Sequence, residues 1–478
     1  MPHDFLAPLM FGALVVFLLL GYPVAFSLAA NGILFAFIGI QMGLLGPELL
    51  QALPERVFGI MRNETLLAIP FFTFMGLVLE RSGMAEELLD TIGQLFGTVR
   101  GGLAYAVVLV GALLAATTGV VAASVISMGL ISLPIMMRYG YSHRLASGVI
   151  AASGTLAQIV PPSLVLIVLA DQLQRSVGDM YAGALIPGLA LAGLYLAYVA
   201  VLSIVKPEAA PALPSEARRL RGGALLARVV VSLVPPLVLV FLVLGTIFLG
   251  VATPTEGGAM GATGALGLAL ARRRLQMEQL RQAMRSTATL TSFVVFILVG
   301  STVFGLTFRA VDGDLWVERL LSDLPGGATG FLIVVNVLVF VLAFFLDFFE
   351  IAFILVPLLA PVADKLGIDL VWFGVILAVN MQTSFMHPPF GFALFYLRSV
   401  APREVRTSDI YWGAVPFVVI QVIMIAVVIA FPQTVMHYKE EPKPAEKGSI
   451  ELQIESPPAE QKTDDPSAEI ERALKQQR

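Results

Sequence analysis

Apolar stretches of about the length of a bilayer crossing alternate with short polar segments along most of the chain. Crossings are predicted over the ranges 6–20, 24–40, 66–79, 181–205, 229–249, 259–271, 288–307 and 411–431. The first stretch lacks the basic start and small-residue cleavage site of a signal peptide, so we expect a retained span. The pattern predicts an all-α polytopic membrane protein.

Polar stretches between the crossings suggest surface helices and helix caps. Ranges 80–100 and 312–323 carry acidic and apolar residues at helical spacing, which predicts helices lying along the membrane surface. Residues 272–285 are expected to return along the surface as well. Glu64 and Glu256 stand close to predicted helix starts, where we expect them to cap the helix.

The segment 148–170 is apolar enough for a bilayer, yet Pro161 and Pro162 lie within it. Both prolines lack an N–H and crowd the preceding turn, so the helix should break there. An unpaired backbone group in hydrocarbon costs several kcal/mol, so such a break is tolerated only inside protein or beside a polar cavity. The alternative is a simple proline kink repaired by local hydroxyls. Residues 235–236, also Pro-Pro, are expected to interrupt the span 229–249.

The break is predicted twice. Gly374-Val375-Ile376 repeats Gly148-Val149-Ile150, and Pro388-Pro389 follows 14 residues after the first glycine, against 13 in the first copy. The motif around Asp179 and Pro187 likewise matches that around Asp409 and Pro416. The chain therefore carries an internal duplication, and paired interrupted segments of this kind point to a transporter binding site.

Each copy also contains a candidate re-entrant hairpin. Range 101–137, at about 1.5 Å per helical residue, is too long for one crossing and too short for two. We place its tip at Thr117 to Gly119, with a tilted span followed by a buried turn as the alternative. Its counterpart, range 331–359, contains Asp347 and Glu350 in apolar surroundings.

The predicted organisation has two inverted repeats around a connecting loop. Its parts are a first repeat 1–206 (hairpin about 103–138, broken helix about 143–172), a cytoplasmic loop 207–228, a second repeat 229–436 (hairpin about 328–362, broken helix about 369–398) and a disordered tail 437–478. About five crossings per repeat give the two copies opposite orientations.

Positive charge sets the predicted orientation. One side holds seventeen Lys and Arg residues, the other six, and the tail seven. The richer side should be cytoplasmic, which places both termini outside.

Composition excludes several classes of protein. The chain is 57% hydrophobic and 13% charged, too apolar for a soluble protein, and it has no cysteine for disulfides, thiolate metal sites or a cysteine nucleophile. No GxxxxGK[ST] loop, HExxH motif or second membrane aspartate partnering Asp347 is present, so we expect neither a P-loop ATPase nor an enzyme.

Clustered oxygens at the two breaks predict coordination of a hard cation. The candidate donors are the side chains of Thr117, Thr118, Ser153, Thr155, Asn380, Gln382 and Thr383 and the backbone of Gly154, Ala157, Val160, Ala343 and Ser384. Thr117, Ser153, Thr155, Asp347, Gln382 and Thr383 are the candidate substrate-binding residues. A lone Ser or Thr in a membrane helix more often bonds its own backbone.

Two further residues have open interpretations. Asp347 should face a cavity or a cation, or else accept hydrogen bonds from free N–H groups at the hairpin tip. His387 is either a packed neutral imidazole or a donor to substrate or carrier of a proton.

Several motifs together resemble one transporter family. The strings SGTLAQIVPPS, ATPTEGG at 252–258 and LDFFEIAFILVP, with ranges 119–134 and 380–391, resemble the large membrane subunit of tripartite ATP-independent periplasmic (TRAP) transporters. The resemblance covers the chain up to about residue 437. It implies a bacterial inner-membrane importer of the elevator type, driven by sodium. A small four-helix membrane subunit and a periplasmic solute-binding protein that delivers an organic acid would be its partners.

The resemblance also implies two sodium sites. The first would use Thr118, Gly154, Ala157, Val160 and Pro162, and the second would use Ala343, Ser384, His387 and Phe390. The chain departs from the family pattern in having Val121 where family members often have a serine, and His387 where they have a threonine. Two other functions stay open: a stand-alone cation-coupled carrier of the same wider fold, and a membrane scaffold or receptor that transports nothing.

Overall fold

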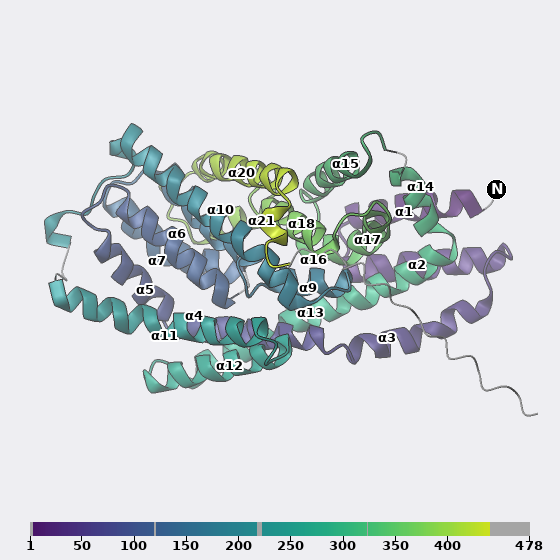
Figure 1. The fold of residues 1–478 in the computed structure, drawn as a ribbon, viewed down its shortest axis with the longest axis horizontal. Coiled ribbons are helices and arrows are strands. Elements are labelled where there is room, and N and C mark those ends of the chain that lie inside the picture. The colour runs from purple at the N-terminus through teal and green to yellow at the C-terminus, as the bar shows by residue number, and fades with distance from the viewer. Residues whose placement is uncertain (1–2, 119–120, 218–221, 323, 440–478) are drawn as a thin grey trace, which may run out of the picture. The chain divides into compact units, whose positions relative to one another are not determined.

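The computed structural model describes residues 3–118, 121–217, 222–322 and 324–439, and the predicted tail lies almost entirely outside them. Regular structure in these ranges is helical throughout, which confirms the all-α prediction. Residues 1–438 form one compact unit, drawn in Figure 1. Six described helices are long and apolar enough to cross a bilayer, or eight if each of two bent pairs is one crossing. The chain is a multi-pass membrane protein.

The N-terminal part contains long helices followed by shorter ones. These are α1 (His3–Leu19), α2 (Val24–Gln41), η1 (Pro47–Ala52), α3 (Leu53–Met61), η2 (Thr65–Leu67), α4 (Ala68–Arg81) and α5 (Met84–Leu95). The expectation that Glu64 caps a helix is wrong: the Asn63 Oδ1 atom accepts from the backbone N–H groups of Thr65 and Leu66, at 3.0 and 3.4 Å. The Asn63 side chain is short and precedes the turn, so its oxygen can reach these N–H groups. Glu64 is itself part of the turn.

The first hairpin and the first broken helix follow. The elements are α6 (Gly102–Thr118), α7 (Val121–Arg138), α8 (His143–Thr155), η3 (Leu156–Gln158), α9 (Leu164–Gln172) and α10 (Val177–Val205). Helices α6 and α7 pack on each other, and the predicted tip falls at their junction. The break between α8 and α9 is confirmed.

The central part departs from prediction in three ways. It contains η4 (Pro207–Ala209), η5 (Ser215–Ala217), α11 (Gly222–Phe248), α12 (Pro254–Ala271), α13 (Met277–Ala310) and α14 (Gly313–Ser322). Helix α11 begins inside the predicted loop and runs unbroken through Pro235-Pro236. Residues 277–285 of the predicted surface segment and the span 288–307 share one helix, α13, because no Gly or Pro interrupts residues 277–299. The cap at Glu256 is confirmed: Thr253 and Glu256 form a reciprocal capping box.

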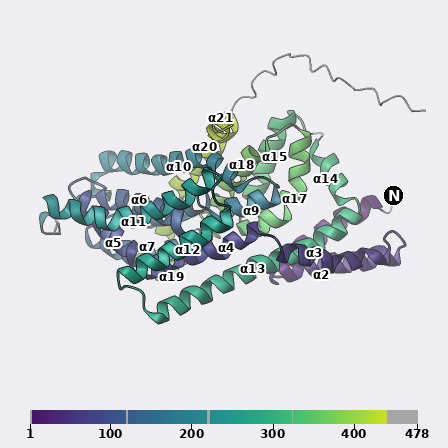
Figure 2. The same cartoon turned by 60° about the horizontal axis from the view of Figure 1, so that its bottom comes forward.

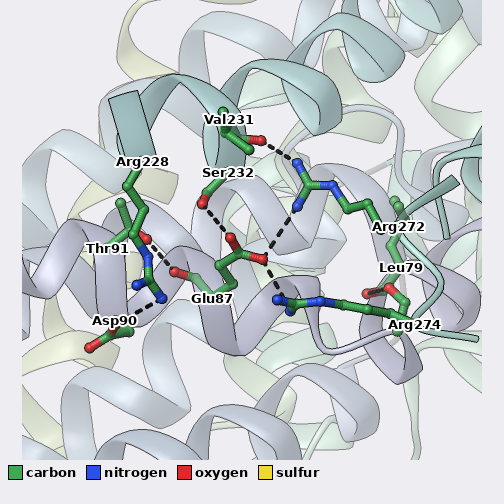
Figure 3. Close-up of polar contacts among 10 residues, drawn as sticks. Leu79, Glu87, Asp90, Thr91, Arg228, Val231, Ser232, Arg272 and Arg274 are labelled. Carbon is green, nitrogen blue, oxygen red and sulfur yellow. Dashed lines mark hydrogen bonds and ion pairs between the residues drawn. The ribbon is translucent and has the colours of Figure 1, made fainter. Parts of the chain in front are cut away.

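Helix α11 stays continuous because a side chain replaces the missing donor (Figure 3). Pro235 has no N–H, so the carbonyl of Val231, four residues earlier, loses its usual partner. The Arg272 guanidinium donates to that carbonyl through Nη2. Glu87 holds this arginine, accepting from Arg272 Nη1 at 3.3 Å and from Ser232 Oγ at 2.9 Å. The prediction of an interruption failed because a distant arginine supplies the hydrogen bond.

The C-terminal part repeats the hairpin and broken helix of the first half, with the returning arm of the hairpin divided into two helices, α16 and α17. It consists of α15 (Gly327–Leu342), α16 (Phe348–Ile354), α17 (Val356–Lys365), α18 (Leu370–Ser384), α19 (Phe392–Val400), α20 (Thr407–Ala430) and α21 (Gln433–Met436). The second break, between α18 and α19, is confirmed. Asp179 and Asp409 lie in the first turns of α10 and α20, as the sequence match requires.

The two broken helices pack crosswise on the long helices of the opposite halves. Helix α8 lies against α20, and α18 lies against α10. A Cβ added to Gly148 would lie 2.1 Å from the carbonyl oxygen of Gly413, so the backbones of α8 and α20 touch. A Cβ on Gly183 in α10 would lie 3.2 Å from Val371 of α18. The halves thus share one core.

The remaining long helices form pairs beside this core. Helix α13 runs along α2, and α4 packs on α12 (Figure 2). Small residues allow the close approach: a Cβ on Gly300 would lie 2.3 Å from the carbonyl oxygen of Ala25. Both views place α5, α6, α7 and α11 on one side of α9 and α18, and α2 and α14 on the other.

Candidate ion and substrate site

The first break leaves one main-chain oxygen without a donor. Pro162 removes the usual partner of the Gln158 carbonyl, and the Ser163 hydroxyl replaces it at 2.5 Å. Pro161 removes the usual partner of the Ala157 carbonyl, and no described group donates to that oxygen in its place. Every residue from 145 to 170 is buried. A fully buried carbonyl without a hydrogen bond is unusual in a folded protein.

The second break repeats this arrangement with different partners. Pro389 frees the carbonyl of Phe385, which instead accepts from the backbone N–H of Ala393 at 3.0 Å. Pro388 frees the carbonyl of Ser384, and no described donor bonds to this oxygen. In both breaks, the carbonyl that loses its donor to the first proline stays open. The carbonyl that loses its donor to the second proline accepts a hydrogen bond from another group of the chain. The two open oxygens belong to residues predicted as cation ligands.

The other predicted ligands lie at or near these oxygens. Val160 lies in the first break and is 6% exposed, and Pro162 follows it. Gly154, on the last turn of α8, is closely packed, because an added Cβ would lie 2.4 Å from Val125 of the first hairpin. The side chains of Thr117 and Thr118 lie outside the described residues, although their backbone ends α6. At the second site Ala343 is the C-cap residue of α15 and is buried.

His387 is packed between two aromatic rings. Its ring centroid lies 4.2 Å from that of Phe340 and 4.3 Å from that of Phe344. The side chain is 2% exposed, and neither ring nitrogen has a hydrogen-bond partner among the described residues. This is the packed imidazole that the sequence offered as one interpretation. Phe390, three residues on, is half exposed.

Asp347 caps a helix at the second hairpin. Its Oδ1 atom accepts from the backbone N–H of Glu350 at 3.0 Å, and the Glu350 carboxylate accepts from the backbone N–H of Asp347 at 3.0 Å. This capping box starts α16. The capping alternative for Asp347 is therefore what the geometry shows, and both side chains lie at the break between α15 and α16, where the tip was predicted.

Most hydroxyls of the predicted site bond their own helices. The Thr155, Thr383 and Ser384 hydroxyls donate to carbonyls three residues earlier, at 2.8, 2.6 and 2.5 Å. The Ser153 hydroxyl is buried and has no partner among the described residues. The hydroxyls therefore contribute their remaining lone pairs at most, which leaves the open carbonyls as the strongest candidate ligands.

The two broken helices meet directly through predicted substrate residues. Gln382 Nε2 donates to Thr155 Oγ1 at 3.2 Å, and these residues are 227 apart, as are Pro161 and Pro388. Gln382 Oε1 has no partner among the described residues. Asn380 instead points to the second hairpin, donating to the Asn336 carbonyl at 2.8 Å.

Gln158 was missed by the sequence analysis. Its side chain is 0% exposed, and neither amide atom has a hydrogen-bond partner among the described residues. It lies between Ala157 and Val160 in the first break. A glutamine in the otherwise apolar stretch before a double proline was the available signal. The described ranges contain no group of three or more His, Asp or Glu side chains that could hold a metal ion.

Comparison with known proteins gives one family. The family model described as "Tripartite ATP-independent periplasmic transporter, DctM component" matches residues 11–434. A C4-dicarboxylate TRAP transporter large permease protein from Pseudomonas aeruginosa is 30% identical over 81% of this chain and 89% of its own length. The sialic acid large permease of Vibrio cholerae is 28% identical, over 86% and 93% of the two chains. The ectoine/5-hydroxyectoine large permease of Ruegeria pomeroyi is 27% identical, over 91% and 99%.

Two solved structures share the fold. The Alcanivorax borkumensis YdaH transporter superposes with a TM-score of 0.57 at 16% identity, covering 81% of this chain and 90% of its own. MtrF from Neisseria gonorrhoeae gives 0.51 at 12% identity, over 80% and 83% of the two chains. At these identities the likeness concerns architecture alone.

Proposed function

We propose that this chain, which belongs to the family of DctM components of tripartite ATP-independent periplasmic transporters, is the large membrane subunit of a sodium-coupled importer. The observation that carries the proposal is the pair of open carbonyls, Ala157 and Ser384, at two buried and related breaks. Sodium takes oxygen ligands, and main-chain carbonyls can replace part of its hydration shell. A bound ion would supply the partner that each oxygen lacks.

The substrate class follows from the relatives and from the residues between the breaks. The relatives are named for C4-dicarboxylates, sialic acid and ectoine, so we propose a small organic acid or a related solute. Gln382 and Thr155 offer polar atoms where the two broken helices meet. The start of α19 and nearby sodium ions would favour a carboxylate.

The transport movement is proposed to be of the elevator type. The crosswise packing of α8 on α20 and of α18 on α10 supports a single transport body built from both halves. Helices α2, α4, α12 and α13 would form the scaffold. The two repeats are proposed to lie in the inner membrane in opposite orientations, with both termini periplasmic.

The partners follow from the same family. We propose that a small four-helix membrane subunit widens the scaffold and that a periplasmic solute-binding protein delivers substrate. Many exposed apolar side chains on α1 and α2, among them Phe5, Leu9, Phe26 and Phe37, are available for lipid or for such a subunit.

Uptake into reconstituted vesicles tests the function. The chain, its small membrane subunit and the binding protein would be combined with radiolabelled C4-dicarboxylate, sialic acid or ectoine. Uptake that needs both an inward sodium gradient and the binding protein is the expected result. Uptake without the binding protein would indicate a stand-alone carrier instead, and absence of flux under every gradient would favour a scaffold or receptor.

Cysteine labelling tests the inverted arrangement. The chain has no cysteine, so Arg175→Cys and Arg403→Cys each introduce a single thiol. These residues occupy equivalent linkers, after α9 and after α19, and Arg403 is exposed while Arg175 forms only a surface ion pair with Asp364. An impermeant maleimide added to spheroplasts should label only the thiol at position 175. Labelling of both positions from the same side would refute opposite orientations.

A further inference from the structure

A buried side-chain hydrogen bond joins the two broken helices close to their open carbonyls. Gln382, on α18, donates through Nε2 to Thr155 Oγ1, on α8, at 3.2 Å. Thr155 stands two residues before Ala157, and Gln382 stands two residues before Ser384. Residues two positions apart in a helix belong to the same turn. The bond therefore begins and ends within one helical turn of the two open oxygens.

The bond connects equivalent positions of the internal duplication. Thr155 and Gln382 are 227 residues apart, and the same interval separates Ala157 from Ser384. Two related copies bring equivalent residues into contact only where they face each other. The bond is thus placed in the same way relative to each break, and a change at either break reaches it over the same short length of chain.

The surroundings hold both side chains in a fixed geometry. Thr155 and Gln382 are 0% exposed, so no solvent can replace the bond. The Thr155 hydroxyl donates to the Ala152 carbonyl at 2.8 Å, which directs its lone pairs toward incoming donors. Tyr195 of α10 also interacts with Thr155, and its hydroxyl accepts from Gln421 Nε2 of α20 at 2.9 Å. A buried polar network of this kind makes the position of each member depend on the others.

We propose that the bond from Gln382 to Thr155 couples the two ion sites, so that sodium at one break raises the affinity of the other. The inference rests on the proposed function, which puts one ion at each open carbonyl. An ion at Ala157 would hold the last turn of α8 and, with it, the hydroxyl that orients Gln382. The end of α18 then loses less freedom when the second ion binds at Ser384. Linkage makes the effect equal in the opposite direction.

Sodium binding to the purified subunit tests the coupling. Equilibrium dialysis with radioactive sodium, in choline chloride and without solute, gives the number of ions bound and the Hill coefficient. For the wild type we expect two ions and a Hill coefficient between about 1.5 and 2. Gln382→Leu and Thr155→Val should still bind two ions, with a Hill coefficient of about 1. The double variant should lose no more cooperativity than either single variant, because both changes remove the same bond.

Two further variants separate coupling from general packing. Thr155→Ser keeps the hydroxyl and should keep the cooperativity. Asn336→Leu is the matched control: this buried amide on α15 accepts from Asn380 of α18 at 2.9 Å, a bond that lies within the second half. It should bind sodium as cooperatively as the wild type. A thermal melt establishes that each variant is folded, and Gln382→Leu alone carries the test if Thr155→Val is not.

The outcomes distinguish this coupling from the proposed function. An unchanged Hill coefficient in Gln382→Leu, or an equal loss of cooperativity in Asn336→Leu, would overturn the coupling. A fall to one bound ion in Gln382→Leu would make Gln382 an ion ligand and overturn it as well. Two ions bound independently by the wild type would refute the coupling and leave the proposed function intact. A wild type that binds no sodium would refute the proposed function, and the coupling with it.

Discussion

One Pro-Pro pair, Pro235-Pro236, lies in α11, and another, Pro161-Pro162, lies in the first broken helix. Only Pro161-Pro162 coincides with a break in its helix. In α11 the freed carbonyl of Val231 accepts from Arg272, and the helix continues. At the first break the freed carbonyl of Ala157 accepts from no described group. The two pairs therefore differ in two ways: only in α11 does the fold supply a partner to the oxygen freed by the first proline, and only the Pro161–Pro162 bond is cis.

A proline in a membrane helix can therefore be purely structural, or it can free a carbonyl that serves as a binding site. Where a side chain such as Arg272 satisfies the oxygen freed by the first proline, that oxygen is not left open for a ligand. At Ala157 and Ser384 the fold leaves the oxygen open in a buried place, where the cost is several kcal/mol unless an ion or water bonds to it. Two related breaks with the same open position make a chance defect a poor explanation.

We expect the largest loss of uptake when the missing backbone N–H donor is restored at one of the two breaks. Pro161→Ala returns an N–H that can bond the Ala157 carbonyl and removes that oxygen from the proposed site. Sodium-driven uptake should fall at least about tenfold, equivalent to ~1.4 kcal/mol. Pro388→Ala should act likewise through Ser384.

Pro235→Ala is the matched control for both. It restores the same kind of hydrogen bond in α11, where no ion is proposed, and should leave uptake within about twofold of wild type. Equal losses in Pro161→Ala and Pro235→Ala would show that the prolines act only on general helix geometry. Size-exclusion profiles in detergent would establish that all three variants are folded.

We expect the next largest effect, a loss of stability, when the packing of the two broken helices is disturbed. Gly148→Ala would place a Cβ 2.1 Å from a backbone oxygen, whereas Gly374→Ala would meet the ends of the Leu173 and Met180 side chains at 2.7 Å. Flexible side chains can move away, so Gly148→Ala should cost about 2–3 kcal/mol and Gly374→Ala less. Thermal unfolding in detergent measures the difference, with Gly193→Ala, an open position on α10, as the reference. A larger loss for Gly374→Ala would contradict the backbone contact between α8 and α20.

Gln158→Leu tests whether the buried amide at the first break has a binding role. Removing a buried amide without partners should stabilise the ion-free protein by about 1–3 kcal/mol. If the amide helps bind the ion or the solute, uptake should fall in the same variant. Phe385→Leu, at the equivalent position 227 residues on, is the control for loss of volume at a break. A less stable Gln158→Leu protein with normal uptake would mean that Gln158 has unseen structural partners.

The smallest expected effect is on the free energy of unfolding, when the hydrogen bond from Arg272 to the Val231 carbonyl of α11 is removed. Arg272→Met removes the donor to Val231 and one ion pair to Glu87. In a Pro235→Ala background the Val231 carbonyl has its own N–H partner, so the same change should cost about 1 kcal/mol less. A double-mutant cycle of unfolding free energies measures this coupling. A coupling near zero would show that Arg272 stabilises α11 through Glu87 alone.

The sequence predicted these regions unequally well, for physical reasons. Local proline chemistry and the repeated GVI and Pro-Pro motifs placed both breaks, and they put Ala157 and Ser384 among five candidate backbone ligands. The same local reasoning failed at Pro235, because the compensating Arg272 lies 37 residues away, directly after the end of α12. Asp347 could be placed at the second hairpin tip, but its capping role depends on a reciprocal capping box in which Asp347 and Glu350 each accept from the backbone N–H of the other. Gln158 stood out in an apolar stretch, but only the packed structure shows that neither of its amide atoms has a partner among the described residues.

Sodium binding to the purified chain tests the central claim most directly. Isothermal titration or sodium-dependent thermal stabilisation, measured without substrate and against choline chloride, would compare wild type, Pro235→Ala, Pro161→Ala and Pro388→Ala. Open main-chain oxygens at both breaks predict binding by the first two proteins and loss of one site in each of the last two. Sodium binding that is unchanged in Pro161→Ala and Pro388→Ala would contradict the account.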